Sequence, residues 1–167
     1  MIKVFAIVLV LLTVSCVKHE AAPTFEPITT FSGRLLVMDT KHRFQVELDW
    51  MANEKQGNLR ITHALSGRVV FVQWKNKVMF WRDNDKTVAW ESLSKQELKD
   101  MGVILPPWTL ARIFLGQYPK TMQTKDEQLW KGTWDDARLQ IKWSDTFRRV
   151  EITDFKQGKR AIVIIHE

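Results

Sequence analysis

Side chains able to act as nucleophiles, acid–base groups or metal ligands form no recognisable catalytic motif in this 167-residue sequence. The four histidines lie near the N-terminus, in two expected turns and at the C-terminus: His19, His42, His63 and His166. No recognisable motif sets any of them against a serine or cysteine nucleophile. Glu47, Asp49 and Glu151 alternate outward on expected strands, as solvated carboxylates do. There is no Gly-rich phosphate loop, H-E-x-x-H or cysteine pair, so we expect no catalytic residue, metal or cofactor.

The only cysteine, Cys16, is the side chain for which the sequence predicts a chemical modification. It follows a basic start and an apolar run, residues 4–12, which is too short to span a bilayer and has the length of a signal-peptide core. Ser15 before Cys16 resembles the lipobox of bacterial lipoproteins, in which a peptidase cuts before the cysteine and the thiol carries diacylglycerol. The alternative is a conventional signal peptide that happens to contain a cysteine. Lipidation is favoured because a lone cysteine has no disulfide partner within a monomer.

These features divide the chain into three parts. Residues 1–15 are expected to be a lipoprotein signal peptide, and residues 16–31 a lipid-anchored tether, because this stretch has two prolines and no periodic pattern. Residues 32–167 then form one domain. In bacterial lipoproteins an aspartate after the cysteine is associated with retention in the inner membrane. Val17 stands there, so the resemblance implies the periplasmic face of the outer membrane, with Cys16 as the anchor.

Composition limits the class of protein. A hydrophobic content of 45% suits one compact domain, and eight tryptophans provide either core packing or the wall of an apolar cavity. The formal charge of +6 is compatible with anionic lipid, nucleic acid or acidic partners. No arginine-rich helix, RNP-like sequence or zinc spacing is present, so we do not expect nucleic acid as a partner.

Alternating apolar and polar residues predict a sheet with one wet face. The clearest strand is 43–50, where Phe44, Val46, Leu48 and Trp50 share one face. Further strands are expected at 34–38, 77–82, 87–90, 129–134, 137–143, 148–154 and 159–165. Their short connections require antiparallel pairing, and a sheet of about nine to eleven such strands curls as twist accumulates. We therefore expect a mainly β fold, an incomplete antiparallel barrel.

The stretch 57–74 predicts a hairpin with an apolar tip. Residues 58–62 alternate between polar and apolar side chains, and residues 69–72 form a dense β-branched and aromatic run. Between them, Gly67 can supply the positive φ of a tight turn. Leu65 should lie at the tip. It either folds back onto the sheet edge or presents an apolar side chain to a membrane or lipid.

Two short helices interrupt the strands. Ser94 and Glu97 form a capping box that opens a helix to about residue 101, with Gly102 as its stop. After a proline-stiffened apolar crossing, residues 109–115 place Leu110, Ile113 and Phe114 on one helical face. These helices are the natural cover for the concave apolar side, which gives a half-open barrel with a short helical lid over an apolar cavity.

Three segments resemble the LolB family of outer-membrane lipoprotein receptors. They are the strand 44–50 ending in tryptophan, the strand–loop–strand 59–67 around Leu65, and 102–119, a proline-entered helix ending in Leu-Gly with a following proline. The resemblance covers the chain from Gly33 to near its end. It implies an outer-membrane lipoprotein that accepts lipoproteins from the periplasmic carrier LolA and inserts them into the outer membrane. By the same resemblance, Leu65 helps to deliver the cargo.

The expected partners are a LolA-like carrier, the acyl chains of client lipoproteins and outer-membrane lipid, with the protein itself a monomer. Candidates for the acyl-chain cavity are the residues on the apolar faces of three strands: Phe44, Val46, Leu48, Trp50, Leu59, Ile61, Leu139, Ile141 and Trp143. For each, plain core packing is the alternative role. The alternative function is a lipid-anchored periplasmic binding or accessory protein for another apolar ligand or partner. A cryptic lipid hydrolase would need a nucleophile that the sequence does not show.

Overall fold

A computed structural model describes residues 24–41, 43–84, 89–100 and 103–166. The signal peptide, Cys16 and the first part of the expected tether lie outside these described residues. The described chain forms one curved sheet of eleven strands with two helices. This confirms the predicted fold class, an incomplete antiparallel barrel with a short helical lid.

The strands and helices follow one another in the order given by their bounds: β1 (Thr30–Met38), β2 (Arg43–Ala52), β3 (Gln56–Thr62), β4 (Val69–Lys75), β5 (Val78–Asp83), β6 (Glu91–Leu93), α1 (Lys95–Asp100), α2 (Pro107–Phe114), β7 (Met122–Thr124), β8 (Leu129–Trp134), β9 (Ala137–Ser144), β10 (Arg149–Asp154) and β11 (Lys159–His166).

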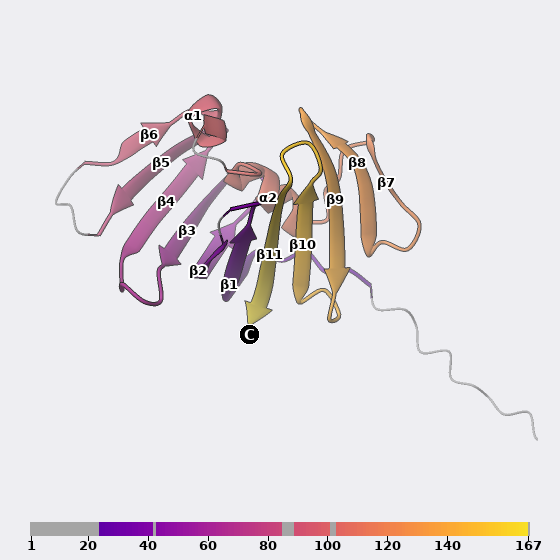
Figure 1. Ribbon diagram of the computed structural model, residues 1–167, viewed down its shortest axis with the longest axis horizontal. Helices are drawn as coiled ribbons and strands as arrows, with labels where there is room; N and C mark the ends of the chain where they lie inside the picture. The colour runs from indigo at the N-terminus through magenta and orange to yellow at the C-terminus, as the bar shows by residue number, and fades with distance from the viewer. Residues whose placement is uncertain (1–23, 42, 85–88, 101–102, 167) are drawn as a thin grey trace, which may run out of the picture.

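The sheet consists of two meanders joined at its centre. Its order is β6-β5-β4-β3-β2-β1-β11-β10-β9-β8-β7, and every described pair is antiparallel. Strand β1 pairs with β11, with Leu35 opposite Val163, so the first and last strands join the two halves. Figure 1 shows these halves on either side of α2. The outer strands β6 and β7 have three residues each and leave the barrel open.

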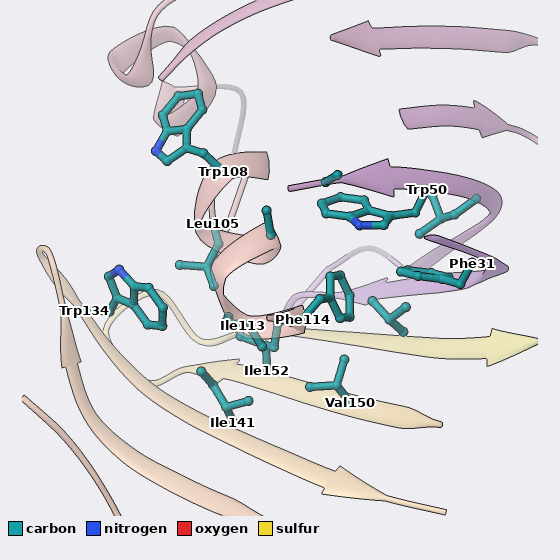
Figure 2. Packing of buried hydrophobic residues seen from close by; sticks show 14 of the residues in the cluster. Phe31, Trp50, Leu105, Trp108, Ile113, Phe114, Trp134, Ile141, Val150 and Ile152 are labelled. Carbon is teal, nitrogen blue, oxygen red and sulfur yellow. The ribbon is translucent and has the colours of Figure 1, made fainter. Parts of the chain in front are cut away.

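Helix α2 packs against the concave face of the sheet. Pro107 begins the helix, where a backbone N–H would have no partner within the helix in any case. Toward the other end, Ile113 and Phe114 are 0% and 1% exposed. Figure 2 shows Ile113 pointing toward Ile141 and Ile152 of the sheet, while the ring of Phe114 lies toward Trp50 and Phe31. The helix therefore buries its apolar face in the hollow of the curved sheet.

Helix α1 begins with the predicted capping box. The backbone N–H of Ser94 donates to Glu97 Oε2 at 2.7 Å, and the backbone N–H of Glu97 donates to Ser94 Oγ at 3.2 Å. The bond from the Ser94 backbone N–H, together with a 2.7 Å bond from the Ser94 hydroxyl to the same oxygen, lowers the pKa of the Glu97 carboxyl, because both favour its charged form. Leu98 is buried beneath the helix at 3% exposure. Within the described part of the chain, no helix is long and apolar enough to cross a membrane.

Three elements differ from the sequence prediction. The strand expected at 87–90 lies instead at β6, where Leu93 pairs with Met79, while residues 85–88 are outside the described chain. Strand β7 was not predicted, because three residues are too few to show an alternating pattern. Residues 24–31, expected in the tether, also contribute Phe25, Ile28 and Phe31 to the core. The core residues of the described part of the chain lie between Phe25 and Ile165, so a protein beginning at residue 17 keeps all of these.

Gly57 provides a test of the packing between β3 and β4. A Cβ atom at this buried position would lie 2.2 Å from Trp74 Cζ2 and 2.7 Å from the Ala52 Cβ. Trp74 is 2% exposed and has no room to retreat. We expect Gly57→Ala to lower the free energy of unfolding by about 1–3 kcal/mol, the usual cost of overpacking. Urea denaturation measures this, and Asn58→Ala, at the exposed neighbouring position, should change it by less than ~0.5 kcal/mol.

Candidate apolar-ligand cavity

A cavity of about 310 Å³ lies between the concave face of the sheet and the helical lid. This volume is near the lower limit of known ligand pockets. Strands β1 to β5, β10 and β11 form its wall, and the segment from α1 to α2 covers it. All its lining residues are apolar: Leu35, Val37, Phe44, Val46, Leu48, Trp50, Leu59, Ile61, Val72, Met79, Leu98, Val103, Ile104, Leu105, Pro107, Leu110, Phe114, Ile152, Ala161 and Val163.

Six of the nine residues expected on the cavity wall line this space. Four are alternate residues of β2: Phe44, Val46, Leu48 and Trp50. The other two are Leu59 and Ile61 of β3, which pair with Trp50 and Leu48 of β2. The structure brings these six together because period-2 alternation on two paired strands directs all of them to the concave face.

The remaining three, Leu139, Ile141 and Trp143, do not line the cavity. They are buried at 1%, 0% and 1% exposure, on β9 in the other half of the sheet. There the concave face is filled, because Phe25 packs edge-on against Trp143 with centroids 5.3 Å apart, and α2 covers Ile141. Their expected place on the cavity wall is therefore corrected to the packed core.

Sequence reasoning missed the part of the wall that comes from the lid. Leu98 projects from α1, Leu105 from the crossing, and Leu110 from the helical face that the sequence indicated. Their apolar spacing was visible, but which of them faces the hollow depends on where α2 sits over the sheet. That position is a tertiary property and not a local pattern.

The cavity reaches solvent at one end of β2. Most lining residues are buried, but Phe44 is 48% exposed and Val103 is 37% exposed. Phe44 is the second residue of its strand, opposite Val37 near the end of β1. These two exposed side chains mark the mouth of the cavity.

The β3–β4 hairpin lies at this same end of the sheet. Thr62, the last residue of β3, pairs with Glu47 of β2, so residues 63–68 extend toward the start of β2. The His63 backbone N–H donates to the Arg68 carbonyl at 2.9 Å, and Gly67 takes a φ of 66°. Leu65 is 95% exposed at the tip, so the structure does not fold it back onto the sheet.

A smaller hollow of about 90 Å³ lies beside Val103, Ile104 and Leu105, which also line the main cavity. Its rim is charged, and Lys95 Nζ is 2.8 Å from Asp135 Oδ2 across it. The hollow is smaller than the ~150 Å³ cavity that holds a benzene molecule in an engineered protein. It is therefore too small for an acyl chain.

No family model matches the sequence, and no curated protein is significantly similar to it. Among solved structures, the crystal structure of the LolA superfamily protein NE2245 from Nitrosomonas europaea is similar, with a TM-score of 0.47 and 10% sequence identity. The match covers 86% of this chain and 87% of that one. The chain's own cavity is the observation from which a function follows.

Tyr118 reports on the packed half of the concave face. It is the only tyrosine, stacked on Trp130 with centroids 3.9 Å apart, and its hydroxyl accepts a 2.8 Å hydrogen bond from Trp143 Nε1. Burial raises the pKa of the Tyr118 phenol to about 12, and the bond from Trp143 opposes this rise only in part. The folded protein therefore favours the neutral phenol.

We expect the tyrosinate absorbance of the folded protein to rise near pH 12, and that of the urea-unfolded chain near pH 10. Below pH 10 the phenol is neutral in both states, so its contribution to stability is complete. Between pH 10 and 12 only the unfolded chain ionises, and stability falls by on the order of 2 kcal/mol. A pH-jump absorbance measurement checks this. An identical midpoint of the tyrosinate absorbance in both states would contradict the burial of Tyr118. The Tyr118→Phe variant, which has no tyrosine, gives the background absorbance.

Filling the cavity from one wall residue tests whether it binds apolar ligands. Val46 lies in the wall at 6% exposure, while Gln45, its neighbour on the same strand, is exposed on the other face. We expect Val46→Trp to weaken binding of a fluorescent 16-carbon fatty acid at least tenfold, because the indole occupies the space. Gln45→Trp should leave the affinity unchanged. Equal affinities for both variants, measured by fluorescence titration, would place the ligand elsewhere.

Proposed function

We propose that this protein is an outer-membrane lipoprotein that accepts the acyl chains of lipoproteins from a LolA-like periplasmic carrier and delivers them into the membrane. The observation that carries the proposal is the wholly apolar cavity, open at Phe44 and Val103 and bordered by the hairpin of Leu65. The LolB-like segments noted in the sequence agree with it. Lipidation at Cys16 would hold the domain at the membrane.

The cavity's size limits how much cargo it can hold. At roughly 30 Å³ for a group the size of a water molecule, its 310 Å³ corresponds to roughly ten such groups. It therefore holds much of one acyl chain, and the other chains of a client would lie at the mouth. Burial contributes about 0.8 kcal/mol for each CH₂, so a partly covered chain is bound but releasable.

The direction of transfer follows from relative burial. The sequence has no nucleotide-binding motif, so each step must be downhill. A receptor that covers more methylenes than the carrier gains the chain, and a bilayer that covers still more takes it away. Leu65, exposed beside the mouth, offers an apolar surface at the point where a chain leaves the cavity.

A second candidate function is binding of another apolar ligand by the same cavity, without delivery. The two are separated by mixing residues 17–167 with LolA that carries a labelled lipoprotein and then isolating each protein. Label on this chain supports the receptor function. Label that stays on LolA, while a fatty acid still binds the cavity, supports the second candidate. Release of free fatty acid from an ester panel would instead indicate a hydrolase.

Leu65→Glu tests delivery apart from binding. A carboxylate at the tip would oppose entry of the hairpin into hydrocarbon, since burial of an unpaired charge is strongly unfavourable. We expect transfer of the labelled lipoprotein into liposomes to fall at least tenfold, while its acceptance from LolA and the urea midpoint stay unchanged. Met51→Glu is the matched control, because Met51 is 57% exposed on the outer face of β2. Equal loss in both variants would contradict a specific role for the hairpin.

A further inference from the structure

The mouth of the cavity is bordered by cations as well as by apolar side chains. Lys41 lies in the β1–β2 turn and Arg43 begins β2, directly before Phe44. Both are exposed, and neither has an acidic partner among the described residues. The acid in the same turn, Asp39, accepts the backbone N–H of Lys41 at 2.7 Å.

Other charged residues on the neighbouring strands are neutralised within the sheet. Arg34 Nε lies 3.0 Å from Glu47 Oε1, and Arg60 Nη1 lies 3.4 Å from Asp49 Oδ2. The two cations at the start of β2 thus differ from the pairs next to them along the same strand. Both are exposed at the same end of the sheet as Phe44, Lys41 in the turn and Arg43 on the convex side of β2.

Apolar and cationic groups therefore occur together at this end of the sheet. Phe44 lines the cavity and is half exposed, and Leu65 projects from the adjacent hairpin. We call Lys41, Arg43, Phe44 and Leu65 the mouth surface. Insertion of apolar tips, with cations beside them, is how proteins bind to the interface of a bilayer that contains anionic lipid.

We propose that the mouth surface docks on an anionic lipid bilayer, with Lys41 and Arg43 on the headgroups and Phe44 and Leu65 in the apolar boundary. The inference extends the proposed function, because it names the surface by which the mouth meets the membrane and the lipid charge it requires. Docking in this way places the opening of the cavity against the bilayer. An acyl chain then passes between them without crossing water.

The test uses residues 17–167, which lack the acyl anchor, and co-sedimentation with two kinds of vesicle. One kind is phosphatidylcholine alone, and the other contains phosphatidylcholine and phosphatidylglycerol at 3:1. The proposal expects tighter binding to the anionic vesicles, weakening as salt is raised. The double variant Lys41→Gln/Arg43→Gln should lower that partition coefficient about thirtyfold, which corresponds to ~1 kcal/mol for each cation. Its weak binding to phosphatidylcholine should not change.

Lys75→Gln/Lys77→Gln is the matched control. These two exposed lysines lie at the β4–β5 turn, at the opposite end of the sheet, and their removal changes the net charge by the same amount. The control should bind anionic vesicles as the unmodified protein does. Equal loss in both double variants would show an effect of net charge alone and overturn the proposal, as would unchanged binding of the first variant. Urea midpoints verify that both variants are folded.

The docking proposal and the proposed receptor function can fail independently of each other. Acceptance of a labelled lipoprotein from LolA is measured without vesicles and does not depend on docking. If acceptance succeeds while the two double variants bind vesicles equally, the receptor function stands and the docking surface is wrong. If acceptance fails while only Lys41→Gln/Arg43→Gln loses vesicle binding, the docking surface stands and the cavity serves another ligand.

Discussion

The packing of Phe114 in the concave face is the interaction on which the rest of the structure depends. Its ring lies 5.0 Å from that of Phe31, 5.1 Å from that of Trp50 and 6.1 Å from that of Trp143, measured between centroids. These partners come from β1, β2 and β9, so one side chain of α2 contacts both halves of the sheet. It therefore holds the helix in the hollow of the curved sheet.

That one helix cannot fill the whole hollow. On the side of β9 and β10, Ile113, Phe25 and Phe147 complete a dense core around Trp143. On the side of β2 and β3, Phe114 only borders the space, and the hollow between the apolar wall and the lid is left unfilled. The side chains that line an unfilled cavity lack packing partners, so the site gains free energy from any hydrocarbon chain that enters. The proposed function follows from this asymmetry between a filled half and a hollow half.

The sequence predicted the fold closely, because antiparallel strands leave a local signature. Alternation along β2 identified Phe44, Val46, Leu48 and Trp50 as one face, and the capping box located α1 within a residue. The same alternation on β9 was read equally well, yet Leu139 and Trp143 are not in the cavity wall. A period-2 pattern gives the face of a sheet on which a residue lies and cannot tell what covers that face. The covering by α2 is decided by contacts between residues distant in the sequence.

The central pairing of β1 with β11 has a consequence for how the chain folds. Each half is a meander of neighbouring strands and can form early, since its contacts are local. Their junction joins residues from opposite ends of the sequence, such as Leu35 and Val163, and bears the loop-closure entropy of nearly the whole chain. The curved sheet, and with it the hollow, is therefore complete only after Lys159–His166 has left the ribosome. Until then the chain has no finished compartment in which to hold a ligand, so binding is coupled to the last step of folding.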